Sequence, residues 1–146
     1  IALHESSLFA MPPGALVEDI FNGTEPGNFG WLTWRGSPSA PILIRSLTAP
    51  GDSAGYLNPS DPDDPSLSIG DWVQASPGLA NAAAIRDALD ALLGQDIVVP
   101  VWDVSSGQGA TTYYRVTAFA LIRLAGYSLP NHNRISAHFL TLTTCP

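Results

Sequence analysis

Apolar side chains recur at helical spacing in one stretch of the chain. Four of them stand at positions i, i+4, i+7 and i+8, with charged residues between them: Ile85, Leu89, Leu92 and Leu93. Gly94 follows directly and is a typical residue at the end of a helix. The pattern predicts one amphipathic helix, from about Leu79 to Leu93.

Strand patterns are more frequent than helix patterns. Ile97–Trp102 is rich in β-branched residues, the turn residues Ser105–Gly109 follow, and Thr111–Leu124 then alternates in the manner of a long strand. In the final run, residues 135–144, the apolar side changes after Phe139, which a β-bulge there or burial of both faces would explain. These patterns predict a β-hairpin, followed by a further antiparallel strand that is connected through the short loop Ser128–Asn133.

Two further strands are predicted earlier, at Phe29–Trp34 and Ile42–Leu47. Between Thr48 and Ser68 the chain is rich in Pro, Asp, Gly and Ser, which predicts a surface loop. We therefore expect an α+β fold that is mainly β with one helix, built as a compact antiparallel β-sandwich or small barrel. Residues 14–146 would form this single domain, and residues 1–13 an extended N-terminal segment.

Composition and charge narrow the classes of partner. With 146 residues the chain has the size of one domain. A net charge of -7, with six Arg and Lys together, disfavours nucleic acid and anionic membrane surfaces, which need clustered cations. No apolar stretch reaches the roughly 18 residues of a spanning helix. The single cysteine, Cys145, excludes an internal disulfide and a multi-cysteine zinc site.

Local motifs for catalysis or cofactor binding are missing from the sequence. The three histidines have no metal-ligand spacing: His4, His132 and His138. We therefore expect a non-enzymatic protein without cofactor or metal, although distant residues could still assemble a hydrolase triad. The acidic loop Asn58–Pro65 leaves a structural calcium site open, but it lacks the glycine pivot and closing glutamate of an EF-hand.

Aromatic residues suggest an alternative class of function. A row of exposed rings could stack on sugars, which would make the chain a monomeric carbohydrate-binding module. In a small β-fold such rings more often pack in the core, and composition alone does not separate the two. The residues concerned are Trp31, Trp34, Trp72, Trp102, Tyr113, Tyr114 and Tyr127.

One sequon for N-glycosylation is present. Asn22-Gly23-Thr24 fits the pattern, so Asn22 is the predicted acceptor of a covalent glycan if the protein is exported through a glycosylating route.

Several short blocks occur in a familiar order. They are Pro26–Leu32, Ser68–Val73, Leu92–Gln95, Val98–Asp103, Ser106–Gly109, Tyr114–Val116 and Phe119-Ala120. This pattern resembles the secreted region of TadE/TadG-like proteins, which are associated with tight-adherence, or Flp-type, pili of bacteria. The resemblance covers about Pro26 to Phe139 and implies an exported, non-enzymatic protein of the bacterial cell surface.

Two departures from that family matter. Its typical members begin with a hydrophobic membrane anchor, which this sequence lacks, and the Asn58–Pro65 loop looks like an insertion. We therefore expect a cleaved or released subunit rather than an anchored accessory protein.

The N-terminal segment offers a means of assembly. Its apolar residues lie ahead of the Pro12-Pro13-Gly14 break, apart from the main strand pattern: Ile1, Leu3, Leu8, Phe9 and Met11. Such a segment could add to the sheet of a neighbouring copy, and head-to-tail contacts of this kind make a filament if they do not close. The expected function is an extracellular subunit that polymerises with itself into a surface fibre. An ordinary strand folded back on its own sheet is the alternative.

Overall fold

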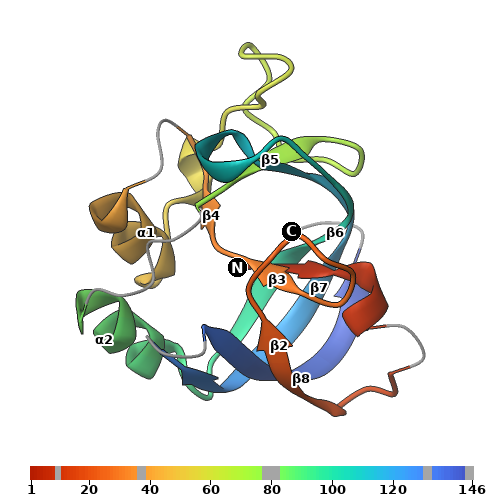
Figure 1. Cartoon of the computed structure of the whole chain (residues 1–146), viewed down its shortest axis with the longest axis vertical. Helices are drawn as coiled ribbons and strands as arrows, with labels where there is room; N and C mark the ends of the chain where they lie inside the picture. The colour runs from red at the N-terminus through yellow and green to blue at the C-terminus, as the bar shows by residue number, and fades with distance from the viewer. Residues whose placement is uncertain (9–10, 36–38, 77–82, 130–132, 144–146) are drawn as a thin grey trace.

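The computed structural model describes residues 1–8, 11–35, 39–76, 83–129 and 133–143. The described residues form a single curled sheet, a half-barrel, with two helices beside it (Figure 1). This confirms the mainly β, α+β class. The strands are β1 Ala2–His4, β2 Leu16–Phe21, β3 Phe29–Gly30, β4 Leu32–Thr33, β5 Trp72–Ala75, β6 Asp96–Ser106, β7 Tyr113–Ser128 and β8 Arg134–Thr143.

The three longest strands, β6, β7 and β8, form an antiparallel meander in the sheet. This meander confirms the predicted hairpin and the predicted antiparallel strand after it. β7 pairs antiparallel with β6 along most of its length and with β8 along its second half. The bulge predicted after Phe139 is present, because Ile122 faces Phe139 while Leu121 faces Thr141, which leaves Leu140 without a direct partner on β7.

The remaining strands close part of the sheet on itself. β1 pairs with β6 and with β3, and β4 pairs with β5, which returns to the first half of β7. Only Trp31 separates β3 from β4, so the predicted strand Phe29–Trp34 is in fact two short strands with different partners. The pairings, together with the chain link from β3 to β4 through Trp31, thus make a circuit of β7, β6, β1, β3, β4 and β5.

Two clusters of buried side chains fill this architecture. The smaller cluster lies among the strands of the circuit and contains Leu32, Val73, Trp102 and Phe119. The larger one includes Ile122 and Ile135 and extends to buried residues of both helices, such as Leu43 and Leu89. β7 contributes to both clusters, with Val116 in the smaller and Ala120 in the larger, and a register shift in its pairing with β6 lies between these two residues.

The segment predicted as the strand Ile42–Leu47 is a helix, α1, which spans Ala40–Leu47. Its N-cap is Ser39, whose hydroxyl accepts the Ile42 N–H at 3.3 Å, and Pro41 stands in the first turn, where its missing N–H costs nothing. Leu43 and Leu47 lie four apart and are both buried. Capping and this spacing outweigh the β-branched character of the two isoleucines.

The second helix agrees with the prediction where it is described. α2 spans Ala83–Leu92 and packs against α1, and the predicted start at Leu79 lies outside the described residues. The Pro/Asp-rich loop at 48–68 contains no strand, only the short 3-10 turn Ser53–Gly55 and a bridge between Asn58 and Asp61. It forms the yellow projection at the top of Figure 1.

Candidate assembly site

The first eight residues, here called the N-terminal arm, consist mainly of β1, which lies between β6 and β3 in the sheet, and the 3-10 turn Glu5–Ser7. β1 runs parallel to β6, with Leu3 beside Val101, and antiparallel to β3, with Leu3 opposite Phe29. The expectation that these residues stand apart from the core is therefore not what the structure shows. They join the core because β1 pairs in parallel with β6, which lies almost a hundred residues further along the chain.

Six of the eight residues in the arm are buried, namely Ile1, Ala2, Leu3, His4, Ser7 and Leu8. Leu3 is 1% exposed and belongs with Ile1 and Leu8 to the larger core cluster, whereas Ala2 belongs to the smaller one. The arm is thus a plug that contributes to both clusters, and its withdrawal would open both of them.

Polar contacts fix the register of the arm. The His4 N–H donates to the Asn28 carbonyl at 2.9 Å, and the Ser7 hydroxyl donates to the Gly27 carbonyl at 2.7 Å. The His4 ring meets Trp102 edge-on, with 4.5 Å between ring centroids, and its Nδ1 accepts the Ser6 N–H. These bonds join the arm to the β2–β3 turn and to β6 without any ion pair among the described contacts.

The connection after the arm has the opposite character. Met11, Pro12, Pro13 and Gly14 are all exposed, and the two prolines stiffen the connection since each fixes its own φ and restricts the residue before it. Phe9, the remaining apolar residue predicted to act in assembly, lies outside the described residues. A buried arm is therefore followed by an exposed, proline-rich connector.

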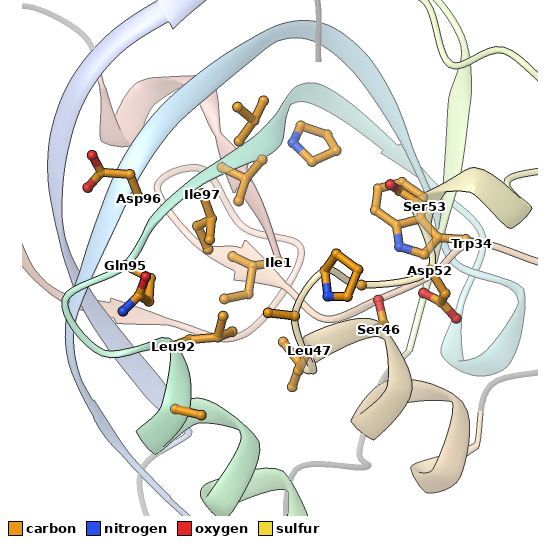
Figure 2. A pocket seen from close by; sticks show the side chains of 17 residues that line it. Ile1, Trp34, Ser46, Leu47, Asp52, Ser53, Leu92, Gln95, Asp96 and Ile97 are labelled. Atoms are coloured by element: carbon orange, nitrogen blue, oxygen red, sulfur yellow. The ribbon is translucent and has the colours of Figure 1, made fainter.

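A cavity of about 450 Å³ is lined in part by Ile1, the first residue of the arm. Figure 2 shows the Ile1 side chain between Leu47 of α1 and Ile97 of β6, with Leu92 of α2 nearby. In the described part of the chain, β1 covers β6 only at Val101 and Trp102, so the stretch Asp96–Pro100 has no strand on that side. The slot that holds the arm is therefore open at this end.

Two charged side chains, Asp52 and Asp96, are among the residues that line this cavity. The Asp96 carboxylate accepts from Arg123 at 2.7 Å, and this hydrogen bond lowers the pKa of Asp96 below its usual value. Asp52, in the loop after α1, has one buried oxygen without a hydrogen-bond partner in the described residues. The wall nearest the arm is apolar.

The predicted glycan acceptor is shielded in the folded chain. Asn22 follows β2, and its backbone N–H donates to the Asn133 carbonyl at 3.0 Å. Its Nδ2 atom, to which a glycan would be attached, is buried and has no hydrogen-bond partner. Glycosylation at Asn22 would require this turn to be open, as it is before folding.

The aromatic residues that could stack on sugars differ in how far the structure buries them. Trp31, Trp102 and Tyr114 are buried, which supports the core interpretation for them, and Trp34 packs against the smaller cluster. Tyr127 is half-buried and donates its hydroxyl to Asp90. Trp72 and Tyr113 remain half-exposed and line a second cavity together.

The described residues contain no group of three or more His, Cys, Asp or Glu side chains that could hold a metal ion. His132 and Cys145 lie outside them. No helix in the described ranges is long and apolar enough to cross a membrane.

Comparison with known proteins gives no relative, since no family model, no curated protein and no solved structure matches the chain.

Proposed function

We propose that the protein is a non-enzymatic structural subunit of an extracellular bacterial fibre, and that it self-assembles head-to-tail by exchange of the N-terminal arm. The observation that carries this proposal is the contrast between the arm and its connector. Six buried residues fill a slot in the sheet, and an exposed Pro12-Pro13 connector joins them to the rest of the chain.

Exchange places the arm of one copy in the slot of the next. The contacts of Leu3 with Val101 and Phe29 are then remade between chains, so the exchanged and closed states differ little in contact energy. The free-energy difference between the two states therefore depends on the conformation of the connector and on protein concentration. A higher protein concentration favours the exchanged state. Each copy gives one arm and receives one, so these head-to-tail contacts grow into a filament when they do not close into a ring.

The arm provides enough buried surface to hold such a junction. Burial of Ile1, Leu3 and Leu8 contributes roughly 1.5–3 kcal/mol for each side chain. Backbone pairing on both sides of β1 and the Ser7–Gly27 hydrogen bond fix the register. Strand addition of this kind joins copies strongly without a disulfide or a metal.

The sequence adds independent support for this class. The blocks between Pro26 and Phe139 resemble the secreted region of TadE/TadG-like pilus-associated proteins, which function at the bacterial cell surface. The net charge of -7 keeps free subunits soluble and apart until specific contacts form.

Assembly is tested first by light scattering of the purified chain over a range of concentrations, followed by electron microscopy of the largest species. We expect the scattering mass to rise with concentration and filaments to be visible. A single monomer peak at every concentration, with no filaments in the micrographs, would refute the fibre proposal.

A competing peptide then tests the mechanism with the full chain. A synthetic peptide with the sequence of residues 1–8, added in excess, should occupy empty slots and stop filament growth. The matched control is the same peptide with Leu3→Asp, which places a charge at a position of the arm that is only 1% exposed and should leave growth unchanged. Equal growth with both peptides would mean that the slot does not accept an arm from another molecule.

A further inference from the structure

A second cavity lies on the outer face of the sheet. Its volume is about 330 Å³, and it is lined by Pro59, Ser60, Trp72, Ser106 and Tyr113. Three of these residues come from adjacent strands, because β5 and β6 both pair with β7, and the other two belong to the Pro/Asp-rich loop at 48–68.

The register of the strands places the two aromatic rings on one face. Trp72 lies opposite Arg115, and Tyr113 is two residues before Arg115 on β7, so all three side chains point the same way. The residues between them, Val73 and Tyr114, are buried on the other face. Trp72 and Tyr113 are therefore diagonal neighbours on a sheet surface and are both half-exposed.

The backbone beneath the rings is well held. The buried Tyr56 hydroxyl donates to the Trp72 carbonyl at 2.8 Å, and Ser106 faces Tyr113 across the β6–β7 pair. The Ser60 N–H donates to the Asn58 side chain at 2.9 Å, which fixes the loop that borders the cavity. The rings are thus presented by a preformed surface.

The polar groups around the two rings carry no net charge. The Ser60, Ser106 and Tyr113 hydroxyls can both donate and accept hydrogen bonds. The nearest cation on this face, Arg115, is bound by Asp103 through two hydrogen bonds of 3.0 and 2.7 Å. A ligand here finds aromatic rings and hydroxyl partners, but no unpaired positive charge among the described side chains that line the cavity.

We infer that this cavity binds a neutral oligosaccharide. The apolar C–H face of a pyranose ring packs against the electron-rich face of Trp72 or Tyr113, and the sugar hydroxyls exchange hydrogen bonds with the serine hydroxyls. A single-stranded nucleic acid would also stack, but a chain of net charge -7 repels its phosphates. The site does not depend on the proposed arm exchange, because none of the residues that line the cavity belongs to the arm.

Binding is tested on the full chain by calorimetry with cellohexaose, chitohexaose, xylohexaose and laminarihexaose as separate probes. At least one probe should bind, and Trp72→Ala and Tyr113→Ala should each weaken that binding by about tenfold or more. The matched control is Phe21→Ala, which removes another half-exposed ring, on β2, and should leave binding unchanged.

A filling variant tests the site without removing a ring. Ser106→Trp keeps Trp72 and Tyr113 and places a bulky side chain in the cavity from the neighbouring strand, so binding should be lost while thermal unfolding stays close to that of the unchanged chain. Failure of every probe to bind at millimolar concentration, or binding that survives Ser106→Trp, would overturn the inference. Tighter binding of a single-stranded oligonucleotide than of any sugar would overturn it as well.

Discussion

Gly30 lies against the ring of Tyr114, so closely that a Cβ at position 30 would stand 2.5 Å from the Tyr114 hydroxyl oxygen. Tyr114 is buried beside Trp102, with 4.6 Å between ring centroids, and cannot easily move aside. Because Gly30 pairs with Ala2, this contact sets how closely β3 approaches the arm.

We therefore expect Gly30→Ala to lower the free energy of unfolding by about 1–3 kcal/mol, the usual cost of overpacking a core. Chemical denaturation measures this. The matched control is Gly126→Ala on β7, where an added Cβ meets no atom within 4 Å and stability should change little. Equal stability of the two variants would show that the Tyr114 ring has room to move.

Acid should weaken the fold through Asp103. The hydrogen bond from Arg115 lowers the pKa of the Asp103 carboxyl, so the folded state binds its proton less readily than the unfolded state does. The resulting stabilisation is present above the unfolded pKa, about 3.9, and is lost as pH falls through the lower folded pKa. Denaturation curves from neutral pH downward should show a decline near pH 4 that is shallower in Asp103→Asn. Identical declines in both proteins would contradict this role.

The N-cap of α1 gives a local prediction. Ser39→Ala removes the oxygen that accepts the Ile42 N–H and should cost about 1 kcal/mol of unfolding free energy. Ser46→Ala, inside the same helix, is the control and should be neutral or slightly stabilising, because alanine is the better helix former. Thermal unfolding of the two variants separates these results.

Glycosylation at Asn22 should depend on the folded state. Because the Asn22 Nδ2 atom is buried, an oligosaccharyltransferase should leave the folded protein unmodified and modify a peptide that covers residues 18–28. Intact-mass analysis reads both reactions, and the Asn22→Gln peptide shows that no other residue reacts. Equal modification of protein and peptide would mean that the turn is open in solution.

Local patterns predicted the elements that are long and periodic. The meander of β6, β7 and β8 and the helix α2 carry strong alternation or helical spacing, and they were recognised for that reason. α1 was mistaken for a strand although Ser39 and Pro41 signal a helix start, because the apolar run Ile42–Leu47 is too short to distinguish the two by periodicity alone.

The candidate sites depend on contacts that local patterns do not contain. The arm is apolar in the sequence, but its place between β3 and β6 comes from pairing over a long sequence separation. Likewise, four tryptophans are equivalent in composition, and only strand register leaves Trp72 beside Tyr113 at the surface while Trp31 and Trp102 are buried.

Disulfide trapping of the arm in its slot tests whether arms are exchanged between copies. Leu3 and Phe29 lie opposite each other on β1 and β3. The next pair along, His4 and Asn28, is joined by a backbone hydrogen bond, so Leu3 and Phe29 form a non-hydrogen-bonded antiparallel pair. The Cα atoms of such a pair are about 4.5 Å apart, which is within the range that a disulfide can bridge. The variant is Leu3→Cys with Phe29→Cys in a Cys145→Ser background, and each single cysteine variant is a control.

The assembled double variant is oxidised and separated on a non-reducing denaturing gel. Arm exchange predicts a ladder of covalently linked chains that collapses to one band on reduction and is missing from both single variants. A single monomer band from assembled, fully oxidised material would mean that each arm stays in its own chain, and would refute arm exchange.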